Sequence, residues 1–220
     1  MKALRDHETF QMTMLQWLAS KRFLGSLAFE GGTMLRLCHE LPRFSLDMGF
    51  CFFKQQNYEA FYNRLSRALS QDHDVVDCRN SNSTILVQIP RQPGMPEFEM
   101  EIRKSAAPPG TTEEKIAFSP YFPTQVLVRG FTLQETLLNM AKALIDHGDI
   151  AHTFDLEFLL RKGIRLKLSS EDRGELMGRL KEFNNNDLHD KLGDLLLPEV
   201  RDYYKREGFS YLEQALSYEG

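Results

Sequence analysis

The chain has 220 residues, of which 42% are hydrophobic and 26% charged, so it can form one domain or two tightly packed lobes around a real core. Its formal net charge of −4 excludes a general electrostatic attraction to nucleic acid, and an RNA or DNA partner would need a local basic patch. Charged residues interrupt the N-terminal segment and no apolar run approaches the ~20 residues of a membrane span, so we expect neither a signal peptide nor a membrane partner.

Helical and strand patterns alternate through the first half of the chain. Apolar spacing predicts helices over 6–20, 33–39 and 58–69, and short aromatic or apolar runs predict strands over 26–29 and 46–53. Turns rich in Asn, Ser, Pro and Gly separate three more predicted strands, at 74–79, 84–89 and 98–103. Residues 106–110 are typical of a linker, and one further strand is expected over 124–128.

The second half of the chain is helical in pattern. We expect helices over 133–147, 152–162, 170–183, 187–196 and 199–217, with breaks near Gly148, Gly163 and Pro198. The sequence therefore predicts an α+β fold. A mixed β-sheet lobe with flanking helices spans residues 1–130, and a helical lobe packed on it spans residues 131–220.

Three cysteines indicate a reducing environment. Cys38, Cys51 and Cys78 are odd in number and lack C-x-x-C spacing. This pattern favours buried, reduced thiols over a disulfide framework or a zinc site, so we expect a cytoplasmic protein.

A glycine-rich turn follows the first predicted strand. Gly31 and Gly32 let the backbone approach a phosphate closely, and the N–H groups of the following helix favour an anion. The Thr33 hydroxyl can add a hydrogen bond. A plain tight turn is the alternative, since Gly-Gly-Thr alone is weak evidence and the neighbouring Glu30 does not help to bind phosphate.

Carboxylates on two predicted strands suggest a metal site. Residues 47 and 49 of one strand point to the same face, so Asp47 is placed as for an Asp-x-Asp pair, but the second position is Gly49. Glu99 and Glu101 share one face of a later strand, and Glu101 is the preferred third acid for two-metal phosphoryl chemistry. The alternative for these glutamates is a solvated strand face.

The residues around this turn resemble the AbiEii/AbiGii toxin family of nucleotidyltransferase-fold proteins. Members look like F-K-G-G-T-x-L followed by R-F-S-x-D-x-D-F, and the chain matches through Phe29-Glu30-Gly31-Gly32-Thr33-Met34-Leu35 and Arg43-Phe44-Ser45-Leu46-Asp47-Met48-Gly49-Phe50. A second similarity, to E-x-L-x-x-K-x-x-A-L-x-x-R and R-D-x-x-D-L, covers Glu135–His147 and Ala151–Leu156 without a gap.

The resemblance implies a polymerase-beta-like lobe with an appended helical region, in a toxin of a bacterial toxin–antitoxin or phage-abortive system. Such proteins transfer a nucleoside monophosphate from an NTP to RNA, notably tRNA, with Mg²⁺, and an antitoxin protein is the implied partner. In a nucleotidyltransferase with this sequence, Asp47 and Glu101 would hold Mg²⁺ and Asp155 would orient the site. Gly31, Gly32 and Thr33 would bind the triphosphate, and Arg36 and Arg43 are candidate phosphate contacts, although Arg43 could instead be the structural partner of an acid.

Several expected site residues are replaced in this chain. The second aspartate is Gly49, the family lysine falls at Met140, and an arginine falls at Ala151. Each charged contact to a transferring phosphoryl group can supply several kcal/mol, and ~1.4 kcal/mol is tenfold in rate. Two interpretations stay open, namely a nucleotidyltransferase of weak or absent activity and a non-catalytic nucleotide- or protein-binding descendant that regulates a toxin–antitoxin or phage-defence system.

Overall fold

The computed structural model describes residues 1–74, 77–91, 93–183 and 187–217. The chain forms two compact units, the first made of residues 1–40 and 44–131, the second of residues 41–43 and 132–220. We call them the sheet unit and the helical unit. Within the described ranges, no helix is long and apolar enough to cross a membrane.

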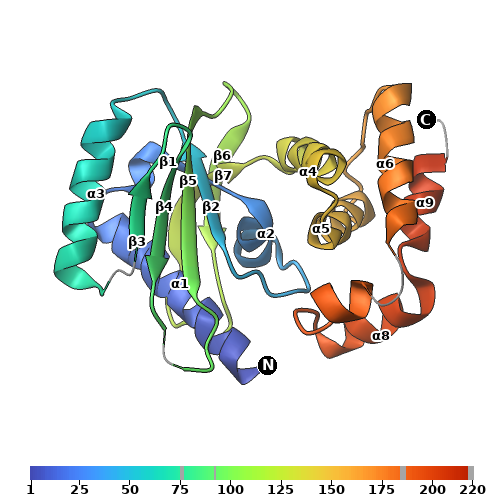
Figure 1. Cartoon of the computed structure of the whole chain (residues 1–220), viewed down its shortest axis with the longest axis horizontal. Coiled ribbons are helices and arrows are strands. Elements are labelled where there is room, and N and C mark those ends of the chain that lie inside the picture. The colour runs from blue at the N-terminus through green and yellow to red at the C-terminus, as the bar shows by residue number, and fades with distance from the viewer. Residues whose placement is uncertain (75–76, 92, 184–186, 218–220) are drawn as a thin grey trace. The chain divides into compact units, whose positions relative to one another are not determined.

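The sheet unit is built on a seven-stranded mixed sheet with the strand order β3-β4-β5-β2-β1-β7-β6 (Figure 1). Strand β2 lies at the centre, antiparallel to β1 and parallel to β5, and β1 is also parallel to β7. The strands are β1 (Leu27–Glu30), β2 (Met48–Phe52), β3 (Asp77–Asn80), β4 (Thr84–Ile89), β5 (Phe98–Ala106), β6 (Thr112–Ala117) and β7 (Val126–Phe131).

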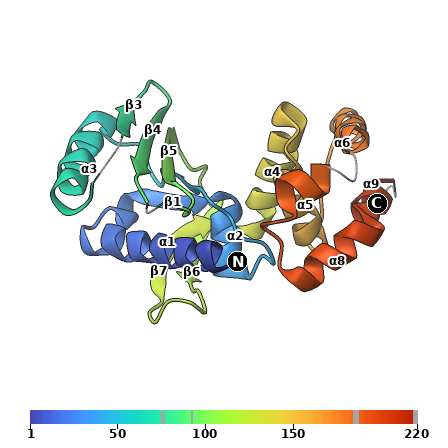
Figure 2. The same cartoon turned by 60° about the horizontal axis from the view of Figure 1, so that its bottom comes forward.

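Aromatic side chains pack one face of this sheet against helices. Phe29 of β1 stacks on Phe50 of β2 at 4.9 Å between ring centroids, and Phe52 meets Phe61 of α3 at 4.9 Å. Because side chains alternate along a strand, Glu30 and Gly49 belong to the opposite face. The helices of this unit are α1 (Lys2–Ser20), η1 (Leu24–Ser26), α2 (Gly31–His39) and α3 (Tyr58–Asp72) (Figure 2).

The helical unit has its core around α5. Phe154, Leu156 and Leu159 of this helix are almost fully buried. Local signals set the ends of the preceding helix: the Thr132 side chain accepts the N–H of Glu135 at the start of α4, and Gly148 ends it in the left-handed conformation. The helices are α4 (Leu133–His147), α5 (Ile150–Arg161), α6 (Ser170–Glu182), η2 (Leu188–Leu192), α8 (Pro198–Glu207) and α9 (Ser210–Ser217).

The predicted α+β fold class is confirmed, since a mixed sheet with flanking helices is followed by a series of helices, α4 to α9. Three elements differ from expectation. Strand β6 follows the 106–110 segment where no strand was predicted, and the helix expected over 199–217 is two helices, because Gly208 has φ 57° and interrupts it. The helix expected over 187–196 is a shorter π-helical segment, η2, at 188–192, and part of the strand expected over 74–79 lies outside the described residues.

Candidate active site on the sheet unit

The glycine turn opens α2 directly after β1. Gly31 has φ 80°, a left-handed conformation that favours glycine, and both Gly31 and Gly32 are half-buried. Glu30 is the N-cap residue, but its side chain makes no capping hydrogen bond. Since the first N–H groups of a helix have no partner within it, the turn presents donors to an incoming anion.

The Thr33 hydroxyl does not join the backbone N–H groups of the turn as a donor to an anion. Its side chain is fully buried, and its hydroxyl donates to the backbone carbonyl of Asp47 over 2.6 Å. The hydroxyl proton is thus used to tie α2 to the residue that precedes β2. Thr33 therefore positions Asp47, whose own side chain is exposed.

The two strands that flank β2 bring acidic residues to the face opposite α3. Gly49 at the centre pairs in register with Glu30 of β1 on one side and with Glu101 of β5 on the other. Glu101 is exposed, and Asp47 stands two residues before Gly49. Of the two predicted metal ligands, Asp47 therefore comes just before β2 and Glu101 lies on the adjacent strand β5.

An ion pair crosses this face at the missing carboxylate. Arg103 of β5 makes a bidentate contact with Glu30 of β1, with Nε donating to Oε1 over 2.7 Å and Nη2 donating to Oε2. The two residues lie on either side of β2, so the contact spans its glycine. The hydrogen bond to Glu30 raises the pKa of Arg103 above its ordinary value, and the charges of Glu30 and Glu101 add to the shift.

The carboxylates on this face are ligands that a hard cation prefers, but they do not form a complete metal site. Exposed carboxylates are the ligands that Mg²⁺ prefers, and this ion is commonly held by one or two of them together with substrate phosphates. Asp47 and Glu101 meet that requirement by residue type. Within the described part of the chain, however, no three His, Cys, Asp or Glu side chains are grouped closely enough to hold a metal ion.

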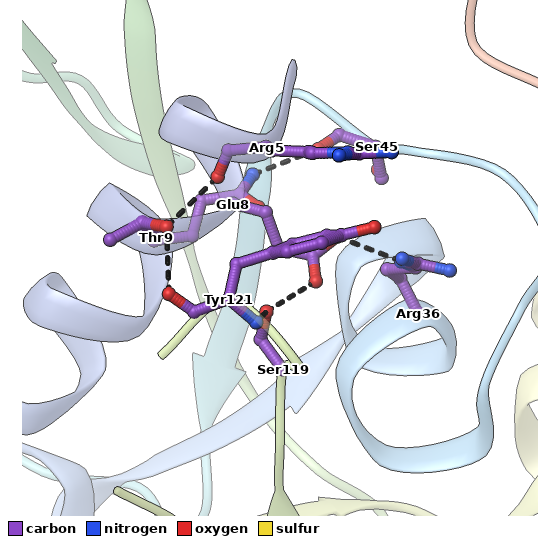
Figure 3. A network of polar contacts seen from close by, with 8 residues as sticks. Arg5, Glu8, Thr9, Arg36, Ser45, Ser119 and Tyr121 are labelled. Carbon is purple, nitrogen blue, oxygen red and sulfur yellow. Dashed lines mark hydrogen bonds and ion pairs between the residues drawn. The ribbon is translucent and has the colours of Figure 1, made fainter. Parts of the chain in front are cut away.

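Arg36 lies in a polar network that joins α1 to α2 (Figure 3). Its Nε donates to Glu8 over 2.8 Å, and the same carboxylate accepts the Ser119 hydroxyl over 2.6 Å. The guanidinium also covers the Phe44 ring at 4.9 Å. Glu8 is only 2% exposed, so Arg36 supplies the charge that this buried carboxylate needs. Arg36 therefore has a structural role in joining α1 to α2.

Arg43 and Asp155 form a buried ion pair inside the helical unit. Nε donates to Oδ1 over 2.7 Å and Nη2 to Oδ2 over 2.6 Å, and both side chains are almost fully buried. The geometry supports the alternative in which Arg43 is the structural partner of an acid, and it identifies that acid. Met140 of α4 is also buried. Burial lowers the pKa of His152, which lies close enough to Asp155 and Arg43 for their charges to act on it.

Two site residues escaped prediction. The sequence indicates Glu30 only as an unfavourable neighbour of a bound phosphate, and it carries no signal for Arg103. Neither could be found from spacing, because the residues are 73 positions apart and meet only through the register of three strands. The glutamates that alternate with apolar residues along β5 are the sequence signal for this face, and they indicate Glu101.

These features agree with a comparison of the sequence with known families. A family model described as nucleotidyl transferase AbiEii toxin, type IV TA system, matches residues 15–209. The chain belongs to this family. Its membership confirms the resemblance seen at the Gly-Gly-Thr and Arg-Phe-Ser motifs, and a toxin–antitoxin family implies an antitoxin partner. No curated protein matches the chain.

Two solved structures share the fold. The crystal structure of JHP933 from Helicobacter pylori has a TM-score of 0.54 and 16% identity, with 94% of this chain and 93% of that one covered. A second H. pylori structure, described as a candidate nucleotidyltransferase, has a TM-score of 0.54 and 17% identity, with 94% and 96% covered. At this identity the likeness establishes the fold of this AbiEii family member and not its reaction.

Proposed function

We propose that this AbiEii family protein binds an NTP at the turn of α2 and transfers its nucleoside monophosphate to RNA, with tRNA as the first acceptor to test, at a rate reduced by the missing carboxylate. The observation that carries the proposal is the register that sets Gly49 between Glu30 and Glu101, on the face where Asp47 is exposed. The face retains acidic groups for phosphoryl transfer but lacks one at the central position.

The chain's own residues have distinct tasks in this reaction. The N–H groups at Gly31 and Gly32 bind triphosphate oxygens, and Thr33 holds Asp47 in place through its carbonyl. An RNA hydroxyl attacks the α-phosphorus, a new P–O bond forms, and the bond to the β-phosphate breaks to release pyrophosphate. We assign the proton of the hydroxyl to the exposed carboxylate of Glu101.

We propose that Mg²⁺ binds together with the nucleotide. Asp47 and Glu101 are the residues that would hold it. When bound, the ion would neutralise charge that develops on the phosphate oxygens. Because Asp47 and Glu101 are only two ligands, we expect the metal to bind the protein much more weakly without NTP than with it.

The buried pair of Arg43 and Asp155 does not contribute to this chemistry in our proposal. Asp155 has no exposed surface, and both of its oxygens accept hydrogen bonds from Arg43. The proposal therefore departs from the family resemblance at these two residues. We still infer that an antitoxin protein is its partner and that the protein acts in phage defence.

A labelling assay tests the function directly. The full chain is incubated with each of four α-³²P-labelled NTPs, Mg²⁺ or Mn²⁺, and total tRNA, and labelled RNA is separated on a gel. Slow labelling that is lost in Asp47→Ala and kept in Arg67→Ala, an exposed substitution on α3, is the expected result. No labelling, together with NTP binding by calorimetry, would support the non-catalytic binding module in its place.

A further inference from the structure

A small pocket lined by aromatic side chains lies on the helical unit. Its volume is about 280 Å³, and all of its described lining residues belong to this unit. Phe158 of α5 and Tyr203 of α8 are half-buried in its lining, which also includes Arg161 and Glu199. Pockets for drug-sized ligands start at about 300 Å³, so this one has room for a group the size of one flat ring system.

A buried carboxylate fixes the aromatic lining of this pocket. Glu157 has no exposed surface, and it accepts hydrogen bonds from Nε of Arg161 over 2.9 Å and from the Tyr204 hydroxyl over 2.8 Å. Nη2 of Arg161 donates to the Tyr203 hydroxyl over 2.6 Å. Because a buried carboxylate left without its partner is costly, Arg161 stays in place and holds the Tyr203 ring. The pocket is therefore organised before a ligand arrives, which lowers the cost of binding.

Two cations lie over the aromatic rings of the pocket. Nζ of Lys162 is 5.0 Å from the centre of the Phe158 ring, and Cζ of Arg161 is 5.2 Å from the centre of the Tyr203 ring. A flat group that enters the pocket thus meets positive charge beside the rings. Aromatic rings combined with cations are typical of protein surfaces on which nucleic-acid bases stack.

A run of cations continues along the chain from this pocket. Residues 161–167 contain four cationic side chains and no acid, although the whole chain has a net charge of −4. Lys162, Arg165 and Lys167 are exposed, and within the described residues none of the three forms an ion pair. Six extended residues span at most about 22 Å, so the backbones of all three lie within that distance of the Arg161 backbone. This is the local basic patch that a chain of negative net charge needs to bind a nucleic acid.

We propose that this surface binds single-stranded RNA, with one unpaired base against Phe158 and Tyr203 and the adjoining phosphates on Lys162, Arg165 and Lys167. Proteins bind single strands by this combination of stacking and a basic groove. A base within a duplex is stacked and paired, so it cannot enter the pocket. The inference rests on the proposed function for RNA as the ligand, but it makes its own claim about where the RNA is held.

Glu199 gives the pocket a preference among bases. It is exposed in the first turn of α8, and it contributes to the lining. A carboxylate accepts a hydrogen bond from the amino group of cytosine, whereas uracil has a carbonyl oxygen at the same position and offers no donor there. We therefore expect cytosine to bind in preference to uracil.

Fluorescence anisotropy measures this preference without catalysis. The full chain is titrated into labelled oligo-C and oligo-U of equal length, in the absence of NTP and Mg²⁺. Oligo-C should bind at least about fivefold more tightly, and Glu199→Ala should remove the difference. The ratio is compared because loss of an acid near phosphates should tighten the binding of both oligomers. Equal affinities of the unmodified chain for the two oligomers would overturn the placement of a base in this pocket.

Two substitutions at Tyr203 separate stacking from folding. Tyr203→Leu removes the ring and should weaken the binding of oligo-C at least about fivefold, as expected for one stacked base. Tyr203→Phe keeps the ring, loses only the hydrogen bond from Arg161, and should bind oligo-C as the unmodified chain does. If the ring has only a structural role, both substitutions lower the thermal midpoint and neither changes RNA affinity. That pattern would overturn the proposal.

The salt dependence of binding tests the cations. Each phosphate contact to a single strand contributes about 0.7 to the slope of log affinity against log salt concentration, so Arg165→Gln and Lys167→Gln should each reduce the slope by about that amount. Lys181→Gln makes the same change in charge on an exposed side chain near the end of α6, and it should leave the slope unchanged. An equal reduction in this control would show that net charge alone determines binding and would overturn the proposal.

An acidic segment of a partner protein is the alternative ligand for a basic, aromatic surface. A labelled polyglutamate peptide carries anionic groups without bases, and it should bind much more weakly than oligo-C. If the peptide binds as tightly as oligo-C, and Tyr203→Leu does not change oligo-C binding, the surface does not select RNA and the proposal is overturned.

Failure of the inference and failure of the proposed function give different results. If an NTP labels RNA while Tyr203→Leu and Arg165→Gln change neither RNA affinity nor the KM for RNA, the inference is wrong and the function stands. If both substitutions weaken RNA binding but no NTP labels RNA, the RNA site stands and nucleotidyl transfer to RNA is wrong.

Discussion

Arg43→Met should destabilise the protein strongly, because it leaves the Asp155 carboxylate buried without a counter-charge. Asp155 is 0% exposed and receives both of its strong hydrogen bonds from Arg43. Removing one partner of a buried ion pair costs about 3–5 kcal/mol. For a chain of 220 residues, at roughly 2–4 °C per kcal/mol, this corresponds to a fall of about 6–20 °C in the thermal midpoint.

Calorimetry and urea unfolding would measure the change. Lys191→Met is the control within the helical unit, since its ion pair with Asp187 is 63% exposed on the lysine side and should contribute less than about 1 kcal/mol. In a double-mutant cycle, Asp155→Leu combined with Arg43→Met should recover much of the loss, because no buried charge remains.

The reasoning would be refuted by a stable Arg43→Met protein that had lost NTP affinity. That result would return Arg43 and Asp155 to the substrate-binding site implied by the family resemblance. Retained NTP affinity in a destabilised protein would instead establish the pair as structural.

Three further outcomes are expected. Gly31→Ala should cost about 1–2 kcal/mol of unfolding free energy through backbone strain alone, because φ is 80° and the space around a Cβ is open; chemical denaturation would measure it. Thr33→Val should remove the 2.6 Å hydrogen bond to Asp47 and lower both stability, by about 1 kcal/mol, and RNA labelling. Burial lowers the pKa of His7 below its ordinary 6.5, so the native state binds fewer protons than the unfolded chain as the pH falls below that value; the unfolding free energy should decrease there, and less so in His7→Gln.

Elements with strong local signals could be predicted closely from the sequence. The bounds expected for β4 and α4 are those observed, because alternating burial marks the first and a Thr132 cap with a terminal glycine marks the second. Strand β6 could not be predicted in the same way. Its residues include two glutamates and a lysine, and it is a strand only because it pairs with β7. Tertiary pairing outweighed local propensity there.

The candidate site likewise contains residues that could be predicted from the sequence and residues that could not. The turn at Gly31 and the acids Asp47 and Glu101 could be named from motif and period. The link between Glu30 and Arg103 depends on strand order and register, which a single sequence does not encode locally. Gly49 lacks the aspartate of the family motif. In the structure, the absence of a side chain at position 49 leaves room for the side chain of Glu30.

The three-residue segment 41–43 has a consequence for how the protein is made. It belongs to the helical unit although it lies between α2 and β2 of the sheet unit, and Arg43 needs an acid 112 residues further on. During translation at about 5–20 residues per second, the arginine must wait several seconds before its partner leaves the ribosome. An N-terminal fragment ending at residue 131 would never meet that partner. Synthesis of the last third of the chain thus completes a contact begun in its first quarter, so the core of the helical unit cannot be finished until most of the chain has been made.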